Sequence, residues 1–171
     1  MTTLLAIRGL REKTDASFRR ALVAMSVRLG VDPNFITPVM ANESGFNPQA
    51  VNPYSKATGL IQFMPSTAIR LGTTVDAIGK MSAEEQLVYV EKYYQPYASG
   101  IKTPGDSYMA VFMPKYIGQP AETVIATNPS NVYTQNKSFD HTNKGYITVG
   151  DVEATSEALY AAALSQPPIV D

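Results

Sequence analysis

Apolar side chains recur at helical spacing through the first part of this chain. From residue 15 to Gly30 they alternate with arginines, and Gly30 ends the repeat. This pattern predicts an amphipathic helix with one face turned to the core. The core-facing positions are Phe18, Ala21, Leu22, Met25 and Leu29.

A second helical pattern follows Asp32 and runs to Glu43. Asp32 is a capping residue type, and Pro33 suits the first turn of a helix. Pro38 removes a backbone hydrogen bond, so the helix either kinks there or begins at Thr37. Both alternatives leave Glu43 at the end of the helix.

Further helices are predicted downstream. A short one covers residues 66–71, and a longer one begins at Ser82 with a capping-box pattern. Its inward positions are expected to be Leu87, Val88, Val90, Tyr94 and Tyr97. Residues 104–114 and 152–164 complete the helical set, while residues 45–59 and 119–137 are predicted to be surface loops. We therefore expect a mainly α fold with little or no β-sheet.

Composition narrows the classes of function. With 171 residues, 44% of them hydrophobic, the chain is long enough for one domain with a core of its own. A net charge of −1 offers no basic field for nucleic acid. The chain has no cysteine and one histidine, which excludes thiol chemistry and histidine metal triads. We expect no cofactor and no bound metal.

The N-terminal apolar run, Leu4 to Ile7, is too short for the core of a signal peptide, and no segment is apolar enough to span a membrane. We therefore expect no encoded export signal. We assign residues 1–14 to an N-terminal arm, 15–165 to a single domain and 166–171 to a tail.

Glu43 is the candidate catalytic residue. Ser44, Gly45 and Pro48 cannot continue the helix easily, so the carboxyl group is expected beside unpaired carbonyls at the negative end of the helix dipole. Burial near Phe46 and other apolar side chains would then favour the protonated form, which a general acid needs. The alternative is an ordinary solvated glutamate at a frayed helix end.

The segment from Glu43 to Pro48, followed by the run Gly59-Leu60-Ile61-Gln62 and Phe63 to Ala68, resembles the lytic transglycosylases and goose-type lysozymes. The resemblance implies a lysozyme-like α+β domain that cuts the β-1,4 bond between N-acetylmuramic acid and N-acetylglucosamine in peptidoglycan. It implies Glu43 as the acid and base, and Ser44, Gln62, Phe63 and Met64 as residues that hold the substrate.

One motif of that family departs from its usual form. Where the family has Ala-Tyr-Asn, this chain has Phe112 as the nearest counterpart, and no asparagine follows. Tyr108 is a candidate for the missing hydrogen bond to the acid, and also for an ordinary packed residue. Phage-type members are more similar, with an apolar segment before proline and an Ile-Gly pair that Ile117 and Gly118 match. We expect the cleft between the Glu43 loop and the helix over residues 108–117.

Several outcomes stay open. The reaction is either a transglycosylation or a hydrolysis, for which Asp32, Asp76 and Asp106 are the candidate second carboxylates. The chain is alternatively a glycan-binding structural module without activity. The resemblance to phage-type members leads us to expect a virion-associated enzyme that acts on the host wall beside other virion proteins. An endolysin is the second alternative. We expect a monomer.

Residues 140–151 resemble an EF-hand loop, with Asp140 first, Gly145 sixth and Asp151 twelfth. Lys144 stands where a ligand oxygen is needed. We therefore expect a turn without calcium, with weak calcium binding as the alternative.

Overall fold

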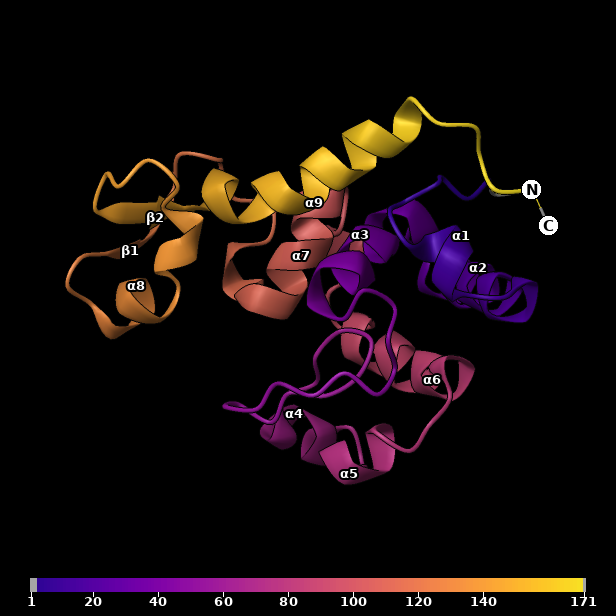
Figure 1. The fold of residues 1–171 in the computed structure, drawn as a ribbon. Coiled ribbons are helices and arrows are strands. Elements are labelled where there is room, and N and C mark those ends of the chain that lie inside the picture. The colour runs from indigo at the N-terminus through magenta and orange to yellow at the C-terminus, as the bar shows by residue number, and fades with distance from the viewer. Residues whose placement is uncertain (1–2, 171) are drawn as a thin grey trace.

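The computed structural model describes residues 3–170, so the outermost parts of the predicted arm and tail, residues 1–2 and 171, lie outside the described residues. The fold is mainly helical with one two-stranded sheet, as expected (Figure 1). The α-helices are α1 (Leu10–Lys13), α2 (Ala16–Leu29), α3 (Pro33–Glu43), α4 (Pro65–Arg70), α5 (Val75–Ile78), α6 (Ala83–Tyr94), α7 (Pro104–Phe112), α8 (Asn131–Gln135) and α9 (Val149–Leu164). Short 3₁₀ helices are η1 (Ala98–Gly100), η2 (Pro114–Tyr116) and η3 (Lys137–Phe139), and the strands are β1 (Val124–Thr127) and β2 (Tyr146–Thr148).

Two helices form as their caps predict. The Asp15 carboxylate caps α2 by accepting from the Phe18 amide at 2.8 Å, and Gly30 ends this helix with a φ of 69°. The Asp32 carboxylate accepts from the Asn34 amide at 2.8 Å and opens α3. Helix α3 then runs from Pro33 through Pro38 to Glu43, so the alternative start at Thr37 is wrong.

The predicted capping box of α6 is confirmed, because Ser82 and Glu85 each bond the other's backbone amide. The prediction that Val88 faces inward is wrong, since Val88 is 53% exposed. Leu87, Val90 and Tyr94 form the buried stripe. One residue along a helix turns the side chain by about 100°, which carries Val88 out of that stripe.

The prediction of a plain loop over residues 119–137 is wrong. Strand β1 pairs antiparallel with β2, with Val124 opposite Thr148 and Thr127 opposite Tyr146. Ser130 caps α8 by accepting from the Tyr133 amide at 3.2 Å. A strand of four residues carries too few positions to show a period, and its partner lies beyond the intervening turn.

Two hydrophobic clusters organise these elements. The larger one joins α2, α3 and α6 with the N-terminal segment, where Leu4, Ile7 and Leu10 are buried. The smaller one lies between α7 and the sheet and includes Met109, Ile147 and Val152. Helix α9 runs from the sheet along α7 and α3 toward the N-terminal segment, where Leu4 and Ile169 form a β-bridge (Figure 1). In residues 3–170, every helix is too short or too polar to cross a membrane.

Candidate active site

Glu43 is the last residue of α3, as the sequence predicts. The Ser44 amide donates to the Met40 carbonyl at 3.1 Å and caps the helix. Gly45 and Phe46 then take positive φ values of 58° and 63°, so the chain turns sharply away. The turn leaves the Glu43 side chain at the junction between α3 and the following loop.

The Glu43 carboxyl group is largely shielded from water and hydrogen bonds to the Tyr108 side chain. Burial raises the pKa of Glu43 above its ordinary value, and the Tyr108 hydrogen bond opposes this shift. A carboxyl group in this state holds its proton to higher pH than a solvated glutamate does, which suits a general acid. The raised pKa is at odds with the alternative of a solvated glutamate.

Two more tyrosines lie close to Glu43. Burial raises the pKa of Tyr93 to about 12, and the negative charge of Glu43 adds a small part of that shift. The pKa of Tyr94 is also raised, mainly by burial. The Tyr93 hydroxyl donates to the Ala110 carbonyl at 3.0 Å, and the Tyr94 hydroxyl donates to the Ser107 carbonyl at 3.1 Å. Both bonds tie α6 to α7, the helix that carries Tyr108.

Ser44 and Gln62 lie in the loop beside the acid. The Ser44 hydroxyl lies 2.9 Å from the Leu60 carbonyl oxygen, and the Gln62 amide nitrogen donates to the Ala50 and Gly59 carbonyls at 3.2 Å each. Gln62 has a φ of 55°. Both side chains therefore brace the loop, and their predicted contacts with a saccharide stay predictions.

Phe63 and Met64 are placed differently from each other. Phe63 is 2% exposed and meets the Tyr93 ring edge-on at 6.3 Å, so it packs in the core against α6. Met64 is 45% exposed at the start of α4. Of this pair, only Met64 offers its side chain to a ligand in solution.

Tyr108 and Phe112 both lie on α7. Tyr108 contacts Glu43 directly, whereas Phe112 packs edge-on against Phe139 at 5.2 Å. The hydrogen bond to the acid thus comes from one turn earlier in α7 than the position of Phe112. The Glu43 loop and this helix thus meet at Glu43 and Tyr108, and the predicted cleft between them stays a prediction.

Gln86 is a residue of the site's scaffold that the sequence analysis missed. It is fully buried on α6, donates to the Pro48 and Ile78 carbonyls at 2.7 and 2.9 Å, and accepts from the Leu60 amide at 2.9 Å. The loop is fastened so closely that a Cβ on Gly59 would lie 2.5 Å from the Gln86 oxygen. The available signal was a polar residue beside Leu87 on the apolar face of α6.

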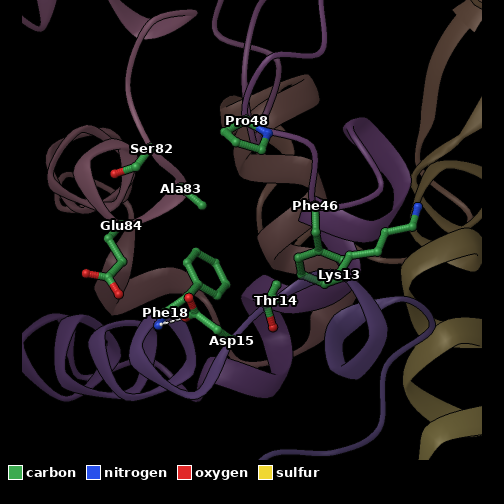
Figure 2. Close-up of a pocket in the computed structure, with 9 residues that line it drawn as sticks. All are labelled: Lys13, Thr14, Asp15, Phe18, Phe46, Pro48, Ser82, Ala83 and Glu84. Carbon is green, nitrogen blue, oxygen red and sulfur yellow. Dashed lines mark hydrogen bonds between the residues drawn. The ribbon is translucent and has the colours of Figure 1, made fainter.

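A cavity of about 370 Å³ lies between the N-terminal segment, the loop after α3 and the start of α6 (Figure 2). Its lining residues are Lys13, Thr14, Asp15, Phe18, Phe46, Pro48, Ser82, Ala83 and Glu84. The Phe46 ring, which we expected beside Glu43, is buried and lines this cavity next to Gly9 and Lys13. Asp15 and Ser82 use their side chains to cap α2 and α6. The cavity therefore presents mainly packing and capping groups.

The EF-hand-like loop is held together by its own groups. The buried Asp140 carboxylate accepts from the Lys144 and Gly145 amides at 3.0 and 2.8 Å and from the Tyr133 hydroxyl at 2.8 Å. The Lys144 ammonium group lies 2.6 Å from both carboxylate oxygens of Asp151. The Lys144 ammonium group thus forms an ion pair with Asp151, the carboxylate at the position that coordinates calcium in an EF-hand.

Comparison with known proteins gives one family match and several relatives. The profile of the transglycosylase SLT domain family matches residues 22–128, which include Glu43, Gln62 and Tyr108. Membrane-bound lytic murein transglycosylase C from Actinobacillus pleuropneumoniae serotype 5b (strain L20) is 48% identical over 46 residues, which are 27% of this chain and 12% of that protein. The same protein from serotype 3 (strain JL03) gives the same figures. The match thus spans a small part of those relatives. Because the family profile covers more than half of the sequence, the chain belongs to the transglycosylase SLT domain family.

Proposed function

We propose that this protein cleaves peptidoglycan glycan strands at the bond between N-acetylmuramic acid and N-acetylglucosamine. The observation that carries the proposal is the shielded Glu43 carboxyl group, with its raised pKa and its hydrogen bond to Tyr108, in a chain of the transglycosylase SLT domain family. The names of the matched relatives, lytic murein transglycosylases, support the same substrate.

Glu43 serves first as acid and then as base. The protonated carboxyl group donates its proton to the glycosidic oxygen as the bond from that oxygen to C1 of the muramic acid breaks. The resulting carboxylate then takes the proton of the muramic acid's own C6 hydroxyl, whose oxygen attacks C1. The product carries a 1,6-anhydro ring, and Glu43 regains its proton.

The placement of the other candidate carboxylates favours this single-glutamate route over hydrolysis. An inverting hydrolase needs a second carboxylate roughly 6.5–9.5 Å from the first. Asp32 caps the opposite end of the 11-residue helix α3, about 16 Å along its axis. Asp106 accepts from the Lys102 and Gly118 amides, each at 2.9 Å, and Asp76 is exposed on α5.

The resemblance of residues 104–118 to phage-type members supports a virion-associated enzyme that acts on the host wall during entry. Met64, exposed beside the Glu43 loop, and backbone groups near Phe63 are then the first contacts for the glycan, while Ser44 and Gln62 keep the loop in shape for it.

Incubation of the protein with purified peptidoglycan tests the proposal. We expect soluble muropeptides to appear and the turbidity to fall. If the protein sediments with the peptidoglycan and releases nothing, it is a glycan-binding module, and the proposed activity is wrong.

A further inference from the structure

The Phe139 ring lies against the helix that completes the candidate site. It meets the Tyr108 ring at 6.3 Å and the Phe112 ring at 5.2 Å, both in edge-on geometry with interplanar angles of 67° and 64°. Phe139 lies beyond residue 128, where the match to the family profile ends. A segment outside that match therefore touches the tyrosine that bonds Glu43.

The position of Phe139 is fixed by the loop that follows it. Phe139 ends η3, and the next residue is Asp140, whose carboxylate is bonded by Tyr133 and by two amides of the loop. The Lys144–Asp151 ion pair and the capping box of α9, in which Thr148 and Asp151 bond each other's amides, close the other end of this loop. The ring is thus attached to a braced turn.

The packing around α7 links this turn to the site. Met109, next to Tyr108, is fully buried in the cluster that also contains Ile147 and Val152. Tyr108 lies at the border of the two hydrophobic clusters, and Phe139 packs on the side of the smaller one. The orientation of a tyrosine hydroxyl depends on two side-chain torsions, which a neighbouring ring restricts.

We propose that Phe139 is a positioning residue, held by the braced loop Asp140–Asp151, that fixes the Tyr108 ring so that its hydroxyl reaches Glu43. The proposal rests on the role of Glu43 in the proposed function. It gives the EF-hand-like loop a task that needs no calcium, namely the support of one side of the active site.

A double-mutant cycle read out on Glu43 itself tests this inference. Tyr108→Phe keeps the ring but removes the hydroxyl, Phe139→Leu keeps an apolar side chain but removes the ring contact, and a third variant combines both. The pKa of the Glu43 carboxyl group is measured by NMR on carbon-labelled glutamate in each protein, and folding is checked by thermal melting. The control is Tyr160→Leu, which removes an edge-on ring contact between Tyr160 on α9 and Phe35 on α3.

Because the Tyr108 hydrogen bond lowers the pKa of Glu43, its loss in Tyr108→Phe raises that pKa. We expect Phe139→Leu to raise it too, to add nothing in the Tyr108→Phe background, and to lower kcat/KM by at most about tenfold. Tyr160→Leu leaves the pKa unchanged. The inference is overturned if Phe139→Leu leaves the pKa as it is, or shifts it equally in both backgrounds.

Two provisions keep the test decisive. If Phe139→Leu does not fold, Phe139→Met takes its place with an apolar side chain of similar length and the same expected result. The pKa readout does not require turnover, so an inactive parent protein refutes the proposed function without touching the inference about Phe139.

Discussion

The turn after α3 and the loop Asp140–Asp151 both hold carboxyl groups out of bulk water, yet they do so with opposite results. Burial raises the pKa of Glu43, and a single side-chain hydrogen bond opposes it. Burial also acts to raise the pKa of Asp140, but Tyr133, Gly145 and Lys144 donate to this carboxylate and lower its pKa overall. Burial dominates at Glu43, the proposed proton donor, whereas several hydrogen-bond donors dominate at Asp140, a structural anion.

The same contrast extends to the neighbouring charges. The pKa of Asp151 is lowered despite its burial, because Lys144 and Thr148 bond it. The groups that interact with Glu43 include the uncharged hydroxyls of Tyr93, Tyr94 and Tyr108. The two regions therefore call for different experiments, on activity for the first and on stability for the second.

The largest effect is expected from Glu43→Gln, which keeps the shape of the side chain and removes the proton. Cleavage of peptidoglycan should fall by roughly 10²- to 10⁴-fold or more with folding intact, measured as muropeptide release. Glu84→Gln, an exposed glutamate on α6, serves as the matched control and should keep full activity. Normal cleavage by Glu43→Gln would remove Glu43 from the mechanism.

The second effect is on the stability of the loop that follows Glu43, which Gln86 fastens to α6. Gln86→Met leaves the Leu60 amide and the Pro48 carbonyl without their partner, at a cost of roughly 1–3 kcal/mol for each orphaned group. Denaturant unfolding measures this loss. Gln95→Met, at the exposed end of α6, should change the free energy of unfolding little. Equal losses in both variants would mean that Gln86 does not brace the loop.

A smaller effect follows from the raised pKa of Glu43. Below the ordinary value of 4.5, Glu43 is protonated in both the folded and the unfolded chain and does not affect their balance. As pH rises through the folded pKa, ionisation in the shielded site lowers the free energy of unfolding. Glu43→Gln should therefore be more stable than the parent at pH 7, with the gap closing near pH 4. A gap independent of pH would contradict the raised pKa.

The pattern of the sequence was sufficient for the elements whose signals are local. Asp32, Ser82 and Gly30 marked helix ends that the structure confirms, and Glu43 was correctly placed at the end of α3. The sequence analysis missed strand β1 and helix α5. Each has four residues, which is too short for a periodic pattern of apolar side chains to be recognised. The Glu43 site was predicted from one motif.

Long-range contacts explain what the sequence did not reveal. The contact of Phe139 with Tyr108 spans 31 positions, and the bond of Gln86 to the Leu60 amide spans 26. Neither contact leaves a local pattern of hydrophobicity. For the same reason the sequence left two interpretations of Tyr108, a hydrogen bond to the acid or ordinary packing. Its partner Glu43 lies on a different helix.

The smallest expected effect is on the loop Asp140–Asp151. Millimolar calcium should leave the melting temperature unchanged, because the Lys144 ammonium group already lies 2.6 Å from the Asp151 carboxylate. The same titration with magnesium is the control for general ionic effects. A rise of several degrees with calcium alone would show that the loop exchanges its lysine for a metal and would weaken the contrast with Glu43.

The most direct test of the central claim is the mass of the muropeptides that the protein releases from purified peptidoglycan. A single glutamate that recruits the substrate's own hydroxyl gives 1,6-anhydro products, which are lighter by one water than hydrolysis products. We predict these anhydro products from the parent protein and neither kind from Glu43→Gln. Reducing-end hydrated products from the parent would contradict the single-glutamate account and would require a second carboxylate, with Asp76 and Asp106 as the residues to test.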